Sequence, residues 1–173
     1  DPLNYTTSGA GSFGHMSMEL LKELGKFDMQ HVAYKGGVPA ITDTIGGQVP
    51  IMYADLVAAL PHIKSGKLVA VAVGSPERVS VVPEVKTIAE QGINGFSAIS
   101  LGALLGPKGM PADVVARLNK EVKEILADKA VQERILGAGA IANFMPAQQL
   151  QDSLSKDYAK WSKVVKDKGM VAE

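Results

Sequence analysis

The feature that most constrains the fold is a repeated order in the first half of the chain, where a β-like run is followed by a glycine-containing turn and then a helical pattern. The expected strands are residues 3–8, 29–34, 49–54 and 68–73, and the expected helices are residues 15–26 and 39–47. This alternation is typical of a parallel α/β sheet. Because the run 68–73 is almost wholly apolar, we expect it to be a strand covered on both faces.

The second half of the chain is dominated by helical patterns. The expected elements are helices at residues 111–125, 129–136 and 150–165, and short strands within 96–111 and 140–145. Tyr158 and Trp161 fall on the apolar face of the closing helix, so both are expected to pack in a core. The run that begins at residue 96 is expected to leave one lobe and enter another. We therefore place a lobe boundary near residues 95–100.

Composition argues against several classes of protein. Eighteen Lys and Arg residues balance eighteen Asp and Glu residues, so the chain lacks the basic surface that nucleic-acid binding requires. The absence of cysteine excludes disulfides, thiolate catalysis and cysteine-ligated zinc. No apolar run approaches the ~20 residues that span a bilayer. The chain starts at Asp1, so a mature or trimmed product is expected, while composition alone leaves the compartment open.

The stretch YTTSGAGSFGH places glycines in the spacing G-x-G-x-x-G, at Gly9, Gly11 and Gly14. In a dinucleotide-binding fold, an acid at the end of the second strand holds the ribose. Here that strand ends in Tyr34-Lys35, and the nearest acid, Asp28, lies at its beginning. No Gly-Lys-Ser/Thr sequence closes the loop, as a P-loop would require. The pattern disfavours a nucleotide site and leaves an NAD-binding enzyme domain as an alternative.

The same loop fits an anion site better. Glycines let a backbone approach a ligand closely, and the N–H groups at a helix start carry positive potential. Ser8 and Ser12 would add hydroxyl donors, and His15 lies in the first helical turn. The loop therefore suits a carboxylate. The plainer alternative is a tight strand-to-helix turn with serine caps and no ligand.

A second glycine turn, YKGGVPAITD, repeats this arrangement. Lys35 can complement an acid, and Gly36 precedes a helix with a proline in its first turn. Asp55 follows the third expected strand, where an N-cap is favoured over contact with a ligand amine or hydroxyl. His31 and His62 have no partner at metal-ligand spacing and are expected to be structural. No nucleophile elbow or paired carboxylates are visible, so no metal, cofactor or catalytic residue is expected.

Four stretches together resemble a known family. They are YTTSGAGSFGHMSMELL, HVAYKGGVPAITDTIGGQVPIMY, ALPHIKSGKLVAVAV and GALLGPKGMPADVVARLN. In this order they are similar to the solute-binding proteins of tripartite tricarboxylate transporters, the Bug or TctC family. The resemblance implies a type II periplasmic binding protein, an α/β fold of two lobes with a cleft between them. It also implies capture of a small di- or tricarboxylate in the periplasm, delivery to membrane transporter components, and no catalysis.

The resemblance further implies a ligand site. The serine and glycine loop that binds one ligand carboxylate falls on Ser8, Gly9, Gly11, Ser12, Gly14 and His15. A second motif lining the same cleft falls on Tyr34, Lys35 and Gly36. The region after the third strand varies in the family, so a contact at Ala54 or Asp55 carries over less directly. An acid there would select ligands bearing an amine.

The resemblance also implies how the chain is organised. Residues 1–96 would form the second ligand-binding lobe, and residues 97–173 the C-terminal part of the first lobe. Relatives carry a further N-terminal segment, so the first lobe is expected to be incomplete here and to need that segment or a second chain. Besides the enzyme alternative, a signalling module that senses a carboxylate through lobe closure stays open.

Overall fold

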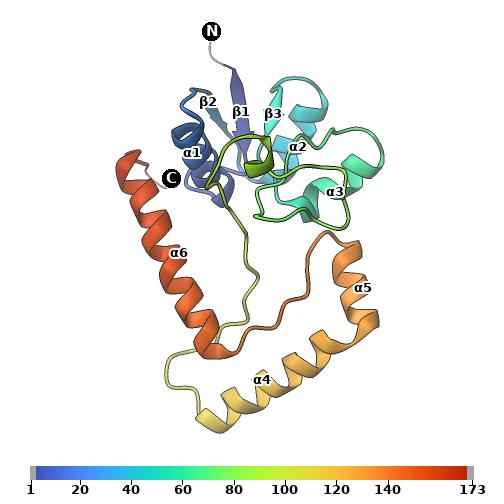
Figure 1. Cartoon of the computed structure of the whole chain (residues 1–173), viewed down its shortest axis with the longest axis vertical. Helices are drawn as coiled ribbons and strands as arrows, with labels where there is room; N and C mark the ends of the chain where they lie inside the picture. Colours follow the sequence, from blue (N-terminus) through green and yellow to red (C-terminus); the bar gives the residue numbers. More distant parts are fainter. Residues whose placement is uncertain (1–2, 171–173) are drawn as a thin grey trace. The chain divides into compact units, whose positions relative to one another are not determined.

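A three-stranded parallel sheet organises the first part of the chain (Figure 1). The computed structural model describes residues 3–170. The strands are β1 (Asn4–Thr7), β2 (Gln30–Ala33) and β3 (Ile51–Met52), in the order β2-β1-β3. In this register Tyr5 of β1 lies opposite both His31 and Ile51. The chain therefore leaves the central strand first toward one edge of the sheet and then toward the other.

A helix follows each strand. These helices are α1 (Phe13–Gly25), α2 (Gly37–Ile45) and α3 (Leu56–Lys64). α1 packs on β1, and α2 packs on β1 and β3. The glycine turns and Pro39, which lies in the first turn of α2, account for where two of these helices begin. The predicted parallel α/β arrangement is confirmed.

The central strand is buried although two of its residues are threonines. Tyr5, Thr6 and Thr7 are fully covered. A buried hydroxyl needs a hydrogen-bond partner. Thr6 donates to the Val32 carbonyl of β2 at 2.8 Å, and the Thr7 hydroxyl lies 2.8 Å from the His31 ring. The strand therefore ends in polar groups that point toward the following loop.

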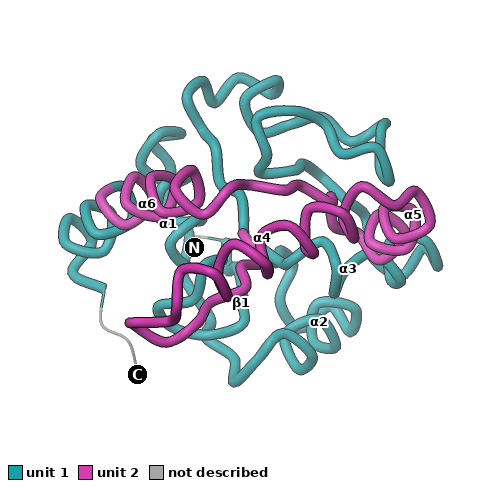
Figure 2. Tube along the Cα trace, turned by 90° about the horizontal axis from the view of Figure 1, so that it is seen from below, with its two compact units in different colours: residues 1–100, 160–173 teal, residues 101–159 magenta. Residues whose placement is uncertain are grey.

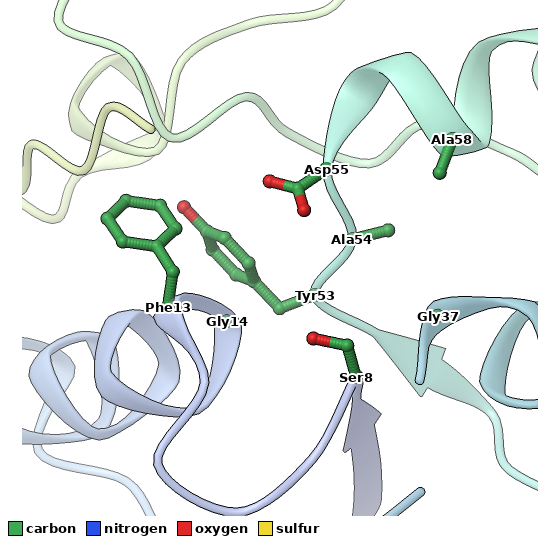
Figure 3. Close-up of a pocket in the computed structure, with 8 residues that line it drawn as sticks. All are labelled: Ser8, Phe13, Gly14, Gly37, Tyr53, Ala54, Asp55 and Ala58. Carbon is green, nitrogen blue, oxygen red and sulfur yellow. The ribbon is translucent and has the colours of Figure 1, made fainter. Parts of the chain in front are cut away.

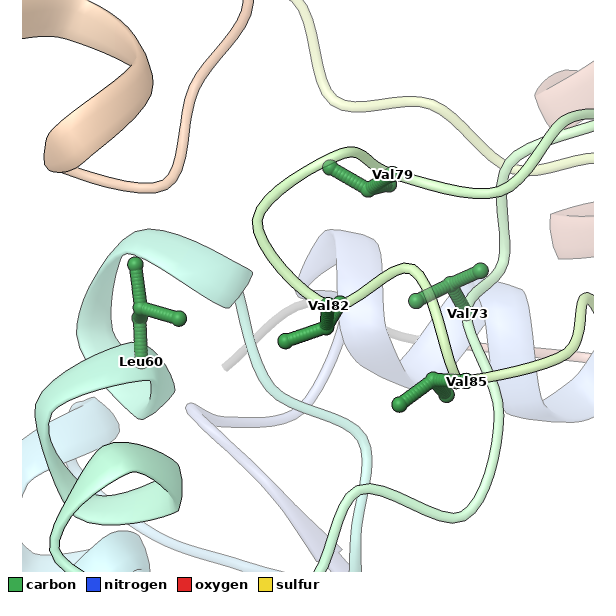
Figure 4. Packing of buried hydrophobic residues seen from close by; sticks show 5 residues of the cluster. All are labelled: Leu60, Val73, Val79, Val82 and Val85. Atoms are coloured by element: carbon green, nitrogen blue, oxygen red, sulfur yellow. The ribbon is translucent and has the colours of Figure 1, made fainter.

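Three apolar clusters hold this part together. The largest consists of Leu60 from α3 and four valines from the segment that follows it, Val73, Val79, Val82 and Val85 (Figure 4). A second joins Tyr5 to Met18 and Met29. A third contains Ile88, Phe96 and Ala98, with Phe13 and Trp161 packed against it. The predicted packing of Trp161 is confirmed, and its ring meets Phe13 edge to face.

The predicted fourth strand is wrong. Within residues 68–73 the structure has one isolated bridge, from Val73 to Thr87. Val69 and Val71 are 85% and 75% exposed. An extended run needs a paired neighbour to become a strand, and among the described residues only Val73 finds one. The short strands expected within 96–111 and 140–145 are likewise absent from the described part of the chain.

The chain divides into two compact units (Figure 2). The first unit contains the residues up to Ser100 and those from Lys160 onward, and the second unit is Leu101–Ala159. A short 3₁₀ helix, η1 (Ala89–Gln91), lies in the first unit. The remaining helices are α4 (Ala112–Ala127), α5 (Lys129–Gly137) and α6 (Ala147–Asp167), and the division falls inside α6. All three match helices expected from the sequence.

The second unit lacks a core of its own. None of its hydrophobic residues, all of them described, is fully buried. The apolar positions of α4 include Val114, Leu118 and Ile125, and each is exposed. Tyr158, predicted to pack in a core, is 77% exposed and that prediction is wrong. The described helices include none with the length and hydropathy of a membrane span.

Candidate functional site

A cavity of about 150 Å³ opens where the strands of the first unit end (Figure 3). It is lined by Ser8, Phe13, Gly14, Gly37, Tyr53, Ala54, Asp55 and Ala58. Ser8 follows β1, Gly37 starts the helix after β2, and Tyr53 follows β3. Ligands of parallel α/β sheets bind beyond the carboxyl ends of the strands, at the point where the strand order reverses. The cavity lies at that point, because β1 has β2 on one side and β3 on the other.

Three helices begin at this cavity. α1 starts after Ser12, α2 after Gly36 and α3 after Asp55. The first N–H groups of a helix have no partner within it. For the amides of Gly14 and Gly37, both of which line the cavity, the described residues supply no acceptor. Helix N-termini carry partial positive charge, so the cavity suits an anionic group.

Two glycines allow the strands and helices to come this close. A Cβ on Gly14 would lie 2.9 Å from the carbonyl oxygen of Tyr53, which follows β3. A Cβ on Gly9 would lie 3.0 Å from the carbonyl oxygen of Tyr34, and the φ of Gly9 is +147°. A side chain at either position would push the loop after β1 away from its neighbours. These glycines therefore shape the cavity whether or not they touch a ligand.

The amides of the glycine loop are largely used within the loop. The Gly9 N–H donates to the Thr7 hydroxyl at 3.3 Å, and the Gly11 N–H donates to Nδ1 of His15 at 3.1 Å. Ser12 is the N-cap of α1, and its hydroxyl accepts from the His15 amide at 3.3 Å. Gly9, Gly11, Ser12 and His15 therefore fix the loop, while the first-turn amide of Gly14 is left for a ligand.

The second predicted loop meets the first through the backbone. The Gly36 N–H donates to the Ser8 carbonyl at 2.9 Å. The Tyr34 hydroxyl donates to Asp43 of α2 at 2.6 Å, and this hydrogen bond raises the pKa of Tyr34. Lys35 is exposed, and neither Tyr34 nor Lys35 lines the cavity. Their contact with a ligand stays a prediction.

Asp55 occupies the N-cap position of α3 without acting as a side-chain cap. Its backbone carbonyl accepts from the amides of Ala58 and Ala59, each at 3.1 Å, but its carboxylate accepts none of the first-turn amides. Figure 3 shows that carboxylate beside the Tyr53 ring, facing the cavity. Burial raises the pKa of the Tyr53 phenol, and the charge of Asp55 adds to this effect. The arrangement leaves Asp55 able to accept a hydrogen bond from a ligand.

A polar cluster lies behind the glycine loop. The rings of His15 and His31 stack with their centroids 3.8 Å apart, and His31 also stacks on Tyr5 at 5.0 Å. Burial lowers the pKa of His31 to about 4, and the neighbouring His15 contributes. Burial also lowers the pKa of His15. The Glu19 carboxylate accepts from the Tyr5 hydroxyl at 2.9 Å and from Lys22 at 2.8 Å.

Comparison with known proteins places this geometry in a family. The family model described as "Tripartite tricarboxylate transporter family receptor" matches residues 1–170. The chain belongs to this family. Its members are solute-binding receptors rather than enzymes, and the solved structures it resembles are periplasmic binding proteins with a mixed α/β fold. The family predicted from the four sequence stretches is confirmed.

Individual relatives of this receptor family agree with the match. Protein BugT of Bordetella pertussis is 32% identical over 95% of the chain and 51% of its own length. The structure of Rpa4515 from R. palustris with adipate superposes with a TM-score of 0.86 at 30% identity, covering 98% of the chain and 56% of that protein. MatC from Rhodopseudomonas palustris, with bound malate, gives 0.72 at 32% identity, covering 94% and 56%. The chain thus spans about half the length of each of these three relatives.

The structure brings together only part of the predicted site. Of the predicted residues, Ser8, Gly14 and Asp55 line the cavity, and Gly36 directly precedes the lining residue Gly37. The sequence analysis missed Phe13, Tyr53 and Ala58, and Ala54, named with Asp55 as a less direct contact, also lines the cavity. Tyr53 directly follows the third strand, where ligands of parallel α/β sheets bind, so its position in the sequence is the signal that could have found it.

Proposed function

We propose that this chain contributes the main anion-binding site of a periplasmic receptor that captures a small di- or tricarboxylate. The observation that carries the proposal is the meeting of three helix N-termini at one cavity, with the amides of Gly14 and Gly37 left for a ligand. The ligands adipate and malate in the related structures are dicarboxylates, which supports the same chemical class. One ligand carboxylate would accept hydrogen bonds from these amides and from the Ser8 hydroxyl.

Asp55 adds a preference for a ligand that carries a hydrogen-bond donor as well as a carboxylate. A carboxylate facing a ligand carboxylate is unfavourable unless the ligand also brings a hydrogen-bond donor. The proposed ligand therefore carries a hydroxyl or an ammonium group, as a hydroxy acid or an acidic amino acid does. Asp55→Asn is expected to weaken binding of aspartate while leaving binding of succinate equal or tighter.

The rest of the receptor follows from the same proposal. The predicted second lobe, residues 1–96, lies within the first unit, which also contains residues 97–100 and 160–173 of the predicted return into the first lobe. The remaining residues of that return, 101–159, form the second unit. The exposed apolar side of α4 suits a covering segment or second chain that completes the first lobe. The completed receptor would close around its ligand in the periplasm and deliver it to the membrane components of a tripartite transporter.

Calorimetric titration tests the proposal. The chain, and a version extended to the length of its curated relatives, are titrated with malate, adipate, citrate and aspartate. Binding of at least one acid is expected, tighter in the extended version because a second lobe adds contacts and excludes water. Ser8→Ala is expected to weaken binding about tenfold. Ser155→Ala in α6, which lies outside the cavity, is the matched control. No binding of any acid by the extended version would refute the proposal.

A further inference from the structure

His15 and His31 are two half-buried titratable groups that the proposed ligand contacts leave unused. Neither lines the cavity, yet both touch the loop that shapes it. His15 comes from the first turn of α1 and His31 from β2, and their rings stack at an angle of 21°. Two elements far apart in the sequence therefore meet directly behind the glycine loop.

The hydrogen bonds of the Thr7 hydroxyl determine which ring nitrogen of His31 carries a proton. The Thr7 hydroxyl oxygen accepts hydrogen bonds from the Gly9 N–H and the Ser12 hydroxyl, each at 3.3 Å. These two bonds fill both acceptor positions of a hydroxyl. The single Thr7 proton then has two possible acceptors, the Gly9 carbonyl at 3.1 Å and Nε2 of His31 at 2.8 Å. If His31 donated instead, Thr7 would have to accept three hydrogen bonds. With the Ser12 hydroxyl donating to Thr7, Nε2 of His31 is the acceptor, and the ring is neutral with its proton on Nδ1.

The hydrogen bond from the Gly11 N–H determines in the same way which ring nitrogen of His15 carries a proton. The Gly11 N–H can only donate, so Nδ1 of His15 accepts it and the proton of the ring is on Nε2. That nitrogen lies 4.0 Å from Glu19. Protonating either histidine would turn its accepting nitrogen into an N–H donor. The Gly11 N–H would then face an N–H of His15, or the Thr7 O–H would face an N–H of His31. The loop conformation thus requires two neutral rings.

Burial keeps both rings neutral near pH 7, although a nearby carboxylate opposes it. The charged groups that act on both rings are Glu19 and Lys22 of α1, and Tyr5 of β1 stacks on His31. Lys22 binds Glu19 at 2.8 Å and Asp28 at 3.3 Å, so the acids are paired with a lysine rather than with a histidine. Burial is the largest effect and lowers the pKa of each histidine. The charge of Glu19 raises both pKa values, and the charge of Lys22 lowers them by a smaller amount.

We infer that His15 and His31 act as paired hydrogen-bond acceptors that position the glycine loop, and that protonation of either ring releases the loop and weakens carboxylate binding. The statement about binding rests on the proposed function. The statement about the loop stands on the contacts alone. In this arrangement the two histidines are positioning residues, and acidification of the surroundings loosens the receptor's hold on its ligand.

Nitrogen NMR tests the loop directly and needs no ligand. At pH 7 the imidazole ¹⁵N shifts are expected to show neutral rings, with the proton on Nε2 in His15 and on Nδ1 in His31. On lowering the pH toward 4, the amide resonances of Gly9 and Gly11 are expected to move with the histidine midpoints. His62 of α3, which makes no hydrogen bond to these amides, is the internal control. Glycine amides that stay still while His15 and His31 titrate would overturn the inference.

Variants extend the test to binding, with malate as the probe. His15→Phe keeps a stacked ring but removes the acceptor, and is expected to weaken binding about tenfold at pH 7. His62→Gln is the matched control. Because malate itself takes up protons below pH 6, the reference for the pH profile is the double variant His15→Asn, His31→Gln, which keeps both acceptors but cannot be protonated.

The two profiles separate the inference from the proposed function. With a pKa of about 4, His31 is protonated in half of the molecules at pH 4. After both proteins are normalised to the same affinity at pH 7, the wild type is expected to bind malate at pH 4 at least about twofold more weakly than the double variant. Coinciding profiles would overturn the role in binding. If the loop titrates with the histidines but no carboxylate binds at any pH, the proposed function fails and the role in positioning the loop is supported.

Discussion

The two units of this chain differ in what holds them together. The first unit has a parallel sheet, three apolar clusters and a central strand in which three of four residues are buried. The second unit, residues 101–159, has well-formed helices but no fully buried hydrophobic residue. Local pattern and capping favour helices, but most helix stability comes from packing an apolar face, and a core needs surfaces that face each other. The fully buried apolar residues of the described chain lie in the first unit, whereas the apolar side of α4 is exposed.

The largest expected effect concerns two leucines, one in each unit. Leu60 is 2% exposed at the centre of the valine cluster, so Leu60→Ala is expected to lower the free energy of unfolding by about 2–5 kcal/mol. Leu118 of α4 is 39% exposed, and Leu118→Ala is expected to cost less than about 1 kcal/mol. Urea unfolding measures both. Equal losses would show that the second unit has a core after all.

The contrast between a buried and an exposed apolar residue also occurs within α6. Trp161, in the first unit, meets the Phe13 ring edge to face at 5.3 Å, and Trp161→Ala is expected to cost about 2–3 kcal/mol. Tyr158, one turn earlier in the second unit, is mostly exposed, and Tyr158→Ala is expected to change stability by less than about 0.5 kcal/mol. Thermal unfolding of the two variants checks this. A larger loss at Tyr158 would contradict the division inside α6.

Acid sensitivity is expected to belong to the first unit, because all three histidines lie there. His31 has a pKa of about 4 when folded and an ordinary value of 6.5. Between these values the unfolded chain takes up a proton that the folded chain does not, so stability falls as the pH drops. The His31 share is on the order of 2 kcal/mol after allowance for its partial exposure.

Urea unfolding of wild type and His31→Gln at pH 7 and pH 4 isolates that share. The variant is expected to lose less stability on acidification than the wild type, while His62→Gln behaves like the wild type. Identical pH dependence in wild type and His31→Gln would mean that the ring is already exposed to protonation in the folded state.

The smallest effect tests local helix formation in the second unit. Asp128 caps α5 by accepting from the amides of Ala130 at 2.7 Å and Val131 at 3.2 Å. Asp128→Ala is expected to destabilise α5 by about 1 kcal/mol. Hydrogen exchange should show faster exchange in α5 and no change in β1. Asp152→Ala, which changes an exposed acid inside α6, is the control. Faster exchange throughout the first unit would contradict the independence of the two units.

The same difference explains what sequence could foresee. The sequence correctly predicted β1, β2, α1 and α2, because the alternation of strand, glycine turn and helix is a local pattern. Residues 68–73 look like a buried strand from composition, but a strand depends on a neighbour, and Val69 and Val71 have none among the described residues. Tyr158 likewise sits on an apolar helix face whose covering surface no local pattern reveals.

The candidate site shows the same limit. The glycine-loop pattern identified Ser8 and the helix start at Gly14, both of which line the cavity. It could not show that the amides of Gly9 and Gly11 are taken by Thr7 and His15, because those contacts depend on the folded loop. His31 was expected to be structural, and its contact with Thr7 became visible only once β2 was placed beside β1.

Amide NMR with malate tests the central claim most directly. The claim predicts saturable shifts of the Gly14 and Gly37 amide resonances, with one dissociation constant for both, while the amides of α4 and α5 stay unchanged. Saturable shifts confined to the second unit, with Gly14 and Gly37 unmoved, would contradict it.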